Sequence, residues 1–458
     1  MAIPANVPFL VGARSSIEGS TWPPLHLGRA ATLAALSAQL AESQWYSPAT
    51  LLQLQNTQLD ALLAHAARHA PHFAQRLAQA GLTLAELSNE EGFQRLPVIR
   101  RRQVQDAGPD LFSRELPKSH APVHTAKSSG STGEPVVIHR TAVNQMDWMA
   151  TTLRDHRWHQ RDFSRRLCAI RPQSDQPERL SHWGGPVSLL FASAPSLILA
   201  PAMSLSRLAA EIERFNPAYL LLYPSILAGL LDHWHHHGGV PAELCEVRLI
   251  GETFSASARD AATAALGVKF TDLYSSQEVG NIALQCPDSG QYHVMAENLR
   301  VEILDDSDRP CAPGRIGRVV VTDLRNFATP LIRYDLGDYA EVVAPCSCGR
   351  GLPTLGRILG RERNLVQLPD GERHWPQVGY QEYRQIAPIR QYQLIQRSRE
   401  RIEVRLCVDG ELTQGQEAAL SKLIRGNLGY AFQLEFVYFA GHLPASPNGK
   451  FEEFICQL

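Results

Sequence analysis

The sequence lacks a surplus of charge of either sign. Lysine and arginine together number 44 and aspartate and glutamate 46, which gives a net charge of −2. Without a basic field we expect no nucleic-acid partner and no binding to an anionic membrane. Internal repeats and low-complexity tracts are also missing, and 44% hydrophobic with 20% charged residues is the composition of a globular protein.

Long apolar runs and export signals are absent as well. The most apolar stretch, "VSLLFASAPSLILAPAM", is interrupted by Pro195 and Pro201, which indicates core rather than a membrane span. The first residues show neither the basic start nor the apolar centre of a signal peptide. We therefore expect a cytoplasmic protein with eight reduced cysteines, in which clustered cysteines are metal-ligand candidates before they are disulfide candidates.

The order of apolar segments predicts an α/β fold. "AYLLLY", "EVRLIG" and "KFTDLY" are typical of buried strands, and helical patterns such as "LSRLAAEIERF" separate them. After residue 298 the pattern changes to strand–turn–strand, and the last hundred residues combine alternating strands with a capped helix. We expect a large N-terminal domain (1–358) of parallel α/β sheets plus a small β region, and a small mobile α+β C-terminal domain (359–458).

One helix is predicted over residues 47–70. Ser47 is a capping residue, Pro48 suits the first helical position, and one apolar face follows. That face consists of Leu52, Leu59, Leu62, Leu63 and Ala66.

A loop of hydroxyls and glycines, "KSSGSTGEPVV", precedes a predicted strand. It has two readings, a surface hairpin turn and a phosphate cradle in which backbone N–H groups and hydroxyls bind an anion. The candidate residues are Ser128, Ser129, Gly130, Ser131, Thr132 and Gly133. The stretch does not match the lysine-containing phosphate loop GxxxxGK[ST], so the loop alone leaves both readings open.

Four further motifs follow in order. "LIGETF" places Gly251 and Glu252 after a strand, where ligands bind in open α/β sheets. "YSSQE" offers an aromatic ring for stacking and a carboxylate for Mg²⁺, "RYDLGD" an acid for ribose hydroxyls, and "PASPNGK" a C-terminal lysine. Each residue also has a structural reading, as a core ring, a turn acid or a solvated lysine. The residues are Tyr274, Ser275, Glu278, Asp338 and Lys450.

A possible metal site is split between two segments. "QCPDSGQYHV" contains Cys286 and His293, and "PCSCGR" contains Cys346 and Cys348. These donors suit a soft tetrahedral metal such as zinc, although the spacing is not that of common zinc fingers. The alternative is a set of separate reduced cysteines and a surface histidine. The histidines of "HWHHHGG" are too contiguous to converge on one ion and indicate a solvated helix end.

In their joint order these motifs resemble the adenylate-forming (acyl/aryl-CoA synthetase) superfamily, and within it the phenylacetate–coenzyme A ligase-like branch. "SSGSTGEP", "YSSQE", "RYDLGD", "GRILGRERN" and "PASPNGK" carry the resemblance, which runs from about residue 50 to the C-terminus. It implies an AMP-forming acid–thiol ligase that uses ATP and Mg²⁺ to activate an aryl or arylalkyl carboxylic acid.

The resemblance also implies residue roles. The hydroxyl- and glycine-rich loop from Ser128 to Gly133 would wrap the ATP phosphates, and Glu278 would hold Mg²⁺. Asp338 would hold the ribose, Arg361 would contact the ribose or phosphate side, and Lys450 would bridge the carboxylate and the α-phosphate. The adenine slot would comprise Gly251, Glu252 and Tyr274, with Ser275 beside it. The branch also carries a zinc ion with ligands from the regions of Cys286, His293, Cys346 and Cys348, which would be structural because four ligands close its shell.

The sequence departs from the family pattern at three places. Glu134 stands where the phosphate loop often has lysine, and Arg363 where the join usually has an acidic residue. The segment "LVQLPDGERHWP" replaces a glycine-bearing stretch that usually passes close to the coenzyme A arm. The acceptor therefore stays open between coenzyme A, the phosphopantetheine thiol of an acyl carrier protein, and an amine. Other readings are a non-catalytic nucleotide-binding scaffold and a zinc-dependent hydrolase. We expect a monomer or homodimer.

Overall fold

The computed structural model describes residues 12–128, 135–171, 176–376, 380–408, 410–440, 443 and 451–458. The chain divides into two compact units. The first unit comprises residues 1–167, 179–197 and 272–358. The second unit comprises residues 168–178, 198–271 and 359–458. The predicted α/β fold class is confirmed. The division into domains 1–358 and 359–458 stays a prediction.

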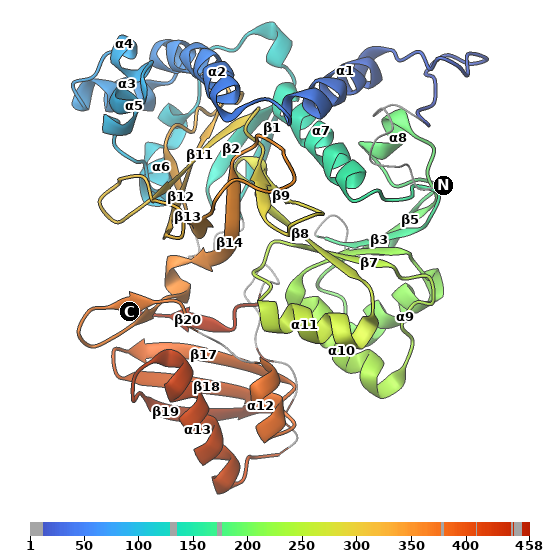
Figure 1. Cartoon of the computed structure of the whole chain (residues 1–458), viewed down its shortest axis with the longest axis vertical. Coiled ribbons are helices and arrows are strands. Elements are labelled where there is room, and N and C mark those ends of the chain that lie inside the picture. The colour runs from blue at the N-terminus through green and yellow to red at the C-terminus, as the bar shows by residue number, and fades with distance from the viewer. Residues whose placement is uncertain are drawn as a thin grey trace. The chain divides into compact units, whose positions relative to one another are not determined.

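The first unit combines helices with an antiparallel sheet (Figure 1). Strands β11, β12, β13, β14, β10 and β9 are neighbours in that order, and β1 and β2 form a separate hairpin. The helices are α1 (Gly28–Ser43), α2 (Pro48–His69), α3 (Pro71–Gln79), α4 (Leu84–Leu87), α5 (Glu90–Arg95), α6 (Arg101–Ala107), α7 (Ala142–Trp158) and α8 (Val187–Leu190), with 3₁₀ turns η1 (Gly108–Leu111) and η2 (Lys118–His120). The strands are β1 (Val123–Lys127), β2 (Val137–Thr141), β9 (Gly280–Gln285), β10 (Tyr292–Val294), β11 (Leu299–Leu304), β12 (Ile316–Asp323) and β13 (Tyr334–Val342).

Five strands contain residues of both units. They are β3 (Leu167–Ile170), β4 (Glu178–Leu180), β5 (Ser196–Leu199), β8 (Lys269–Ser276) and β14 (Thr354–Arg361). Both β3 and β5 are fully buried, as expected for the apolar stretch that contains β5. No helix in the described ranges is long and apolar enough to cross a membrane.

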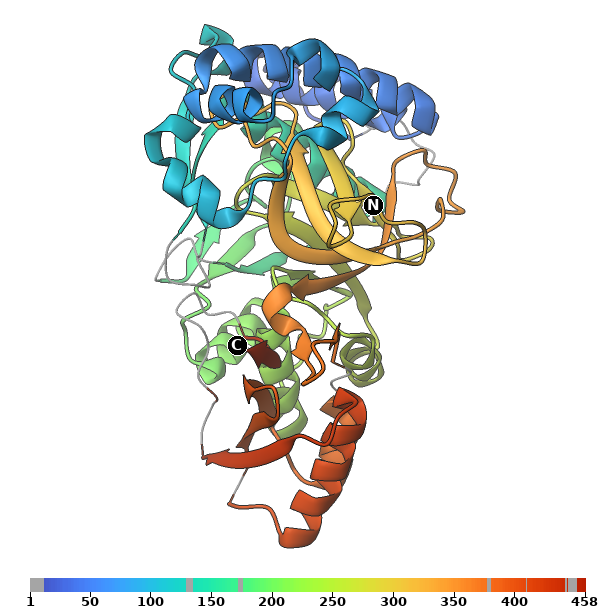
Figure 2. The same ribbon diagram turned by 90° about the vertical axis from the view of Figure 1, so that its left-hand side faces the viewer.

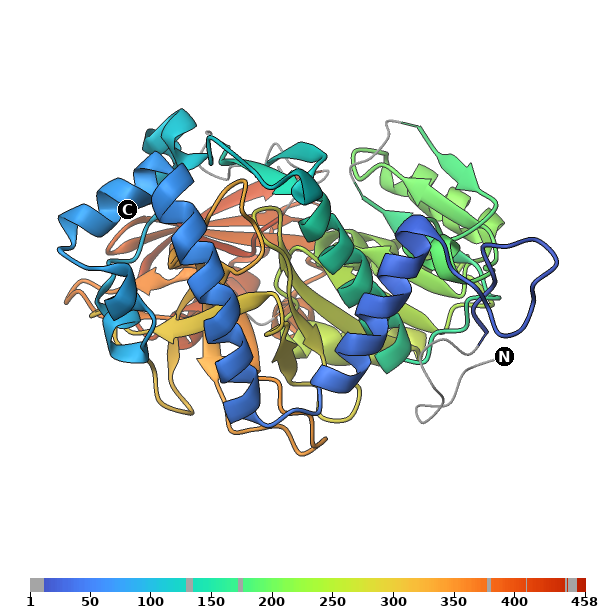
Figure 3. The ribbon, with the colours of Figure 1, turned by 90° about the horizontal axis from the view of Figure 1, so that it is seen from above.

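Helix α2 confirms the predicted element and corrects its buried face. The Ser47 side chain caps it by accepting a hydrogen bond from the Thr50 N–H (3.1 Å). Leu52 was wrongly placed in the core, because it is 42% exposed while Leu51 is only 4% exposed. The physical reason is a change of partner along the helix: Leu51 packs with Trp158 and its neighbours, whereas the rest of the face packs into a different apolar cluster. Helices α1 and α7 lie side by side (Figures 1 and 3).

The second unit contains parallel strands and a small α+β assembly. Strands β6 (Tyr219–Leu222) and β7 (Glu246–Ile250) pair in parallel, as their continuous apolar runs predicted. The helices are α9 (Leu205–Phe215), α10 (Pro224–His237), α11 (Ala256–Leu266), α12 (Tyr380–Ile386) and α13 (Gln414–Leu428), with η3 (Glu362–Asn364). The other strands are β15 (Val366–Gln367), β16 (Arg373–His374), β17 (Gln391–Ser398), β18 (Arg401–Cys407), β19 (Gln433–Phe439) and β20 (Phe454–Cys456).

Helix α13 covers the four-stranded sheet β19-β18-β17-β20 (Figure 2). The Thr413 and Gln416 side chains form the predicted capping box, each accepting a hydrogen bond from the backbone N–H of the other. Leu420, Ile424 and Leu428 are fully buried against the sheet. This apolar cluster belongs to the segment that carries the C-terminal lysine motif.

Candidate nucleotide and metal sites

Part of the predicted phosphate loop and the predicted catalytic lysine lie outside the described residues. These are Ser129, Gly130, Ser131, Thr132, Gly133 and Lys450, together with the departure at Glu134. The residues that flank the loop are described. The Ser128 N–H donates to the Val136 carbonyl (2.9 Å), and the Val136 N–H donates to Ser128 Oγ (2.8 Å). The two ends of the loop are therefore tied together.

Arg101, the first residue of α6, joins this loop to the predicted Mg²⁺ ligand. Its Nη2 donates to Ser128 Oγ (2.8 Å), and its Nη1 lies 3.5 Å from Glu278 Oε1. The Arg101 side chain is 21% exposed and that of Glu278 only 7%. A cation and a buried carboxylate thus flank the base of the loop. Sequence reasoning missed Arg101; the only signal was a run of three arginines before a helical pattern.

Two residues predicted for the nucleotide site, Tyr274 and Asp338, are hydrogen-bonded to each other, and their roles toward a nucleotide stay predictions. Tyr274 is on β8 and Asp338 on β13, and the Tyr274 hydroxyl donates to Asp338 Oδ2 (2.9 Å). The Tyr274 ring is buried in the apolar cluster that also contains Val279 and Ile282. A register shift between Tyr274 and Ser275 interrupts the β8–β9 ladder just before Glu278. Such a bulge reorients side chains next to a site.

In the second unit, Glu252 binds two segments that are far apart in sequence. Its carboxylate accepts hydrogen bonds from the Ser225 N–H (2.9 Å), the Ser225 hydroxyl (3.0 Å) and the Phe451 N–H (3.0 Å). Gly251 has a φ of +74°, a conformation that favours glycine. Since Phe451 directly follows Lys450, Glu252 anchors the end of the lysine motif. The sequence alone gave no indication of this contact.

Hydrogen bonds and an ion pair connect the join around Arg361 to the C-terminal residues 452–454. The Arg361 N–H donates to Asn364 Oδ1 (2.9 Å), and Asn364 Nδ2 donates to the Phe454 carbonyl (2.7 Å). Arg363, the departure from the family pattern, forms a two-point ion pair with Glu452, in which Nε donates to Oε2 at 2.8 Å. Arg363 therefore has a structural partner two residues beyond Lys450. The roles predicted for Gly251, Glu252 and Arg361 toward a nucleotide stay predictions.

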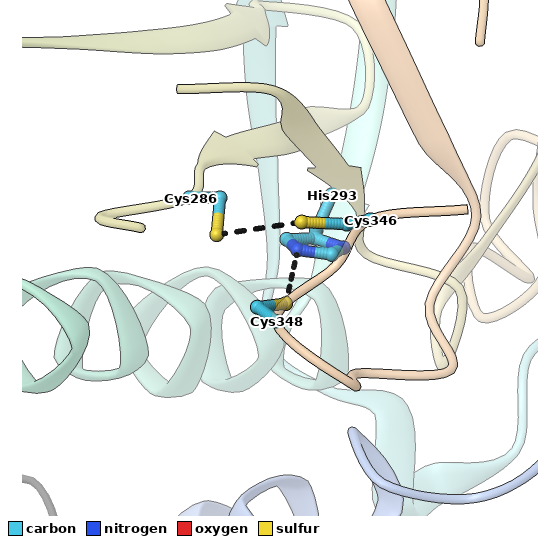
Figure 4. Close-up of side chains that lie close together, drawn as sticks. All are labelled: Cys286, His293, Cys346 and Cys348. Carbon is cyan, nitrogen blue, oxygen red and sulfur yellow. Dashed lines mark hydrogen bonds between the residues drawn. The ribbon is translucent and has the colours of Figure 1, made fainter. Parts of the chain in front are cut away.

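The four candidate metal ligands converge in the first unit (Figure 4). Cys286 follows β9, His293 lies on β10, and Cys346 and Cys348 come from the β13–β14 loop. Their ligand atoms all lie within 4.8 Å of one another. Cys286 Sγ is 3.8 Å from Cys346 Sγ, and Cys348 Sγ is 3.3 Å from His293 Nε2. None of these cysteines forms a disulfide bond.

The donor set fits zinc. Three sulfurs and one imidazole nitrogen are a common structural zinc shell. Burial lowers the pKa of His293 to about 4, so that the ring is neutral at physiological pH, the form that binds metal. The second ring nitrogen, Nδ1, faces the Leu352 carbonyl at 3.4 Å, a position from which a backbone oxygen can orient a metal-bound histidine.

Comparisons with known proteins agree with the motifs. No protein-family model matches the chain. A phenylacetate-coenzyme A ligase of Thermus thermophilus is 27% identical over 335 residues, 69% of this chain and 71% of that protein. The phenylacetate-coenzyme A ligase of Escherichia coli is 23% identical over 334 residues, 69% of this chain and 72% of that protein.

A solved structure shares the fold over most of the chain. It is 2-hydroxyisobutyryl-CoA ligase in the postadenylation state with 2-HIB-AMP, at a TM-score of 0.70 and 20% identity, covering 88% of this chain and 89% of that one. The predicted enzyme class, an AMP-forming acid–thiol ligase, agrees with the names of these proteins. The chain is a relative of the phenylacetate-coenzyme A ligases and has the fold of the adenylate-forming superfamily, as its motifs predicted.

Proposed function

We propose that the protein activates a carboxylic acid with ATP, releases pyrophosphate, and transfers the acyl group from the acyl-adenylate to the thiol of coenzyme A. The observation that carries the proposal is the contact of Arg101 with both Ser128 and Glu278, which brings a cation and a buried acid to the base of the phosphate loop. The names of the relatives support the same reaction.

Activation requires that a carboxylate and an α-phosphate, both anionic, approach each other. Positive groups reduce this repulsion and stabilise the charge that develops on pyrophosphate. In the proposal Lys450 bridges the two reacting anions, and the loop from Ser128 to Gly133 holds the β- and γ-phosphates. Mg²⁺, held by Glu278, supplies further charge neutralisation when it is bound. Asp338 accepts hydrogen bonds from the ribose, and Tyr274 contacts the adenine.

Arg101 supplies the positive charge that the phosphate loop lacks. The loop has Glu134 where its family often has lysine. The Arg101 guanidinium is already bonded to Ser128 at the start of the loop, and its planar fork suits phosphate oxygens. In this assignment, Arg101 binds a phosphate of ATP when the nucleotide is bound, and this contact partly replaces the ion pair of Arg101 with Glu278.

The proposal also names the thiol that accepts the acyl group and the class of acid that is activated. Coenzyme A is favoured because the curated relatives are coenzyme A ligases. A carrier-protein thiol or an amine remains the alternative, because Arg363 changes the join and is fixed to Glu452. We assign the acid to the aryl or arylalkyl class, because the curated relatives are named phenylacetate-coenzyme A ligases. None of the eight cysteines forms a disulfide bond with another described residue, which fits a cytoplasmic location.

Zinc has a structural role in the proposal. Cys286, His293, Cys346 and Cys348 would occupy all four positions of a tetrahedral ion, which leaves no position for a water nucleophile. This set argues against a zinc-dependent hydrolase. With these ligands, zinc would connect the β9–β10 hairpin to the β13–β14 loop.

A product analysis tests the proposal. Purified protein, ATP, Mg²⁺ and one aryl acid are incubated with coenzyme A, with a phosphopantetheinylated carrier protein, or with an amine, and the products are separated by mass spectrometry. We expect AMP in every productive reaction and the acyl thioester with coenzyme A. ATP binding without acyl-adenylate for any acid would favour the scaffold reading, and an amide alone would replace coenzyme A by an amine.

A further inference from the structure

Arg140 is a second arginine near the predicted active site, on the strand that follows the phosphate loop. Along β2 the side chains alternate between two faces. His139 stacks on Phe112 with ring centroids 3.9 Å apart, whereas Ile138 packs with Tyr274 in the first unit's main apolar cluster. Arg140 therefore projects from the same face as Ile138, toward the segment that carries Tyr274 and Glu278.

The Arg140 guanidinium lies directly against Gly280. A Cβ atom on Gly280 would lie 2.8 Å from Arg140 Nη2 and 3.5 Å from Nη1. Gly280 has a φ of +84° and follows the predicted Mg²⁺ ligand Glu278 by two residues. Both the missing side chain and the unusual backbone conformation thus allow a guanidinium to occupy this position.

Among the described residues, Arg140 forms no hydrogen bond or ion pair. The other arginine nearby, Arg325, is paired with Asp147 (Nη1 to Oδ1, 2.8 Å). Asp323 accepts hydrogen bonds from Asn144 and from the Arg325 N–H. Asp147 and Asp323 act on Arg140 only through their charge, and burial raises the pKa of Asp147 to about 6 and of Asp323 to about 7. The Arg140 fork is available for an anion.

Arg140 is set apart along the strand from the base of the phosphate loop. Val136 is the residue tied to Ser128 at the loop base, and Arg140 is four residues further along the strand. At roughly 3.3 Å per residue the two positions are about 13 Å apart, and Arg101 already serves the loop base. This separation favours the acid, rather than the ATP phosphates, as the partner of Arg140.

We infer that Arg140 binds a second anionic group on the acid, so that the substrate is a dianionic acid, such as an aryl dicarboxylate, activated at one carboxylate only. The inference rests on the proposed function and names the substrate class of that site. A planar guanidinium recognises a carboxylate through two parallel hydrogen bonds, a contact that an uncharged substituent cannot replace.

The test compares acids that share a skeleton and differ in one carboxylate. ATP–pyrophosphate exchange is measured with benzoate against isophthalate and terephthalate, and with phenylacetate against 3- and 4-carboxyphenylacetate. We expect kcat/KM at least about tenfold higher for the dianionic member of one pair, because a site built for a charged group rejects the analogue that lacks it. A wild-type preference for the monoanionic acid in every pair would overturn the inference, with no variant needed.

Variants show whether Arg140 is responsible. Arg140→Gln should raise the KM for the preferred dianionic acid about tenfold or more and leave the KM for ATP within twofold, and Arg140→Lys should restore part of the loss. His139→Gln, on the opposite face of the same strand, is the matched control. If Arg140→Gln lowers kcat/KM equally for monoanionic and dianionic acids, or lowers it for neither, the inference is overturned. Thermal unfolding of each variant shows whether the substitution impairs folding. If Arg140→Gln does not fold, Arg140→Lys and the wild-type preference between the two acid classes test the inference instead.

Failure of this inference is distinguishable from failure of the proposed function. If the protein catalyses exchange with monoanionic acids and Arg140→Gln does not change that activity, the inference about Arg140 is wrong and the proposed acid-ligase function still holds. Absence of exchange with all acids, while ATP still binds, removes both.

Discussion

Replacing Arg101 by glutamine should weaken ATP binding far more than acid binding. The substitution removes a charge whose Nη1 lies 3.5 Å from Glu278 Oε1 and whose Nη2 donates to Ser128 Oγ at 2.8 Å. Two unit charges 3.5 Å apart interact by about 5 kcal/mol at an effective dielectric constant of 20. This is an upper limit, because the side chain is 21% exposed and the bond replaces hydration.

A net value of about 1.5–3 kcal/mol is typical of a hydrogen bond to a charged group. If Arg101 binds a phosphate with that strength, Arg101→Gln raises the KM for ATP by roughly 10- to 100-fold, since about 1.4 kcal/mol corresponds to a factor of ten. The KM for the acid should change less than threefold. The folded state should also lose stability, because Glu278 is left buried without its nearest cation.

Steady-state ATP–pyrophosphate exchange at varied ATP and at varied acid separates the two KM values. Arg102→Gln is the matched control, since this neighbour is 90% exposed and pairs only loosely with Asp106, at 3.7 Å. It should behave like the wild type. An Arg101→Gln enzyme whose KM for ATP stays within twofold of the wild-type value would refute the assignment of Arg101 to the phosphates.

Two further predictions concern the metal and pH. Cys348→Ser should reduce the zinc content, measured by atomic emission, well below the one ion per chain expected of the wild type. It should also lower the unfolding temperature. The control variant Cys456→Ser should change neither the zinc content nor the unfolding temperature. Burial raises the pKa of Asp323 to about 7, so its folded form holds a proton more tightly than the unfolded chain. Wild-type stability should therefore fall as pH rises from about 4 to about 7, by up to about 4 kcal/mol from this group, and denaturant titrations of Asp323→Asn should show a flatter profile.

The sequence predicted those features that depend on local chemistry. The capping box of α13 follows from Thr413 and Gln416 because both partners lie within one turn. The four metal-ligand candidates were named from their donor types and from the family resemblance, and the structure brings all four together. The parallel pairing of β6 and β7 follows from their uninterrupted apolar runs.

Features that depend on distant packing could not be predicted. Leu51 rather than Leu52 is buried because the first turn of α2 meets a cluster that includes residues from much later in the chain. Arg101 is one of three consecutive arginines, and only the fold shows which of them faces Glu278. Arg140 gave no signal in the sequence, since its position depends on the close approach of Gly280.

ATP–pyrophosphate exchange with and without Lys450 tests the central claim most directly. The wild-type protein and Lys450→Ala are assayed against benzoates, phenylacetates, their carboxylated analogues, cinnamates and fatty acids. The proposed function predicts exchange with at least one acid, and its near-complete loss in the variant while ATP and acid still bind. Near-normal exchange in Lys450→Ala, or wild-type protein that binds ATP and exchanges with no acid, would contradict it.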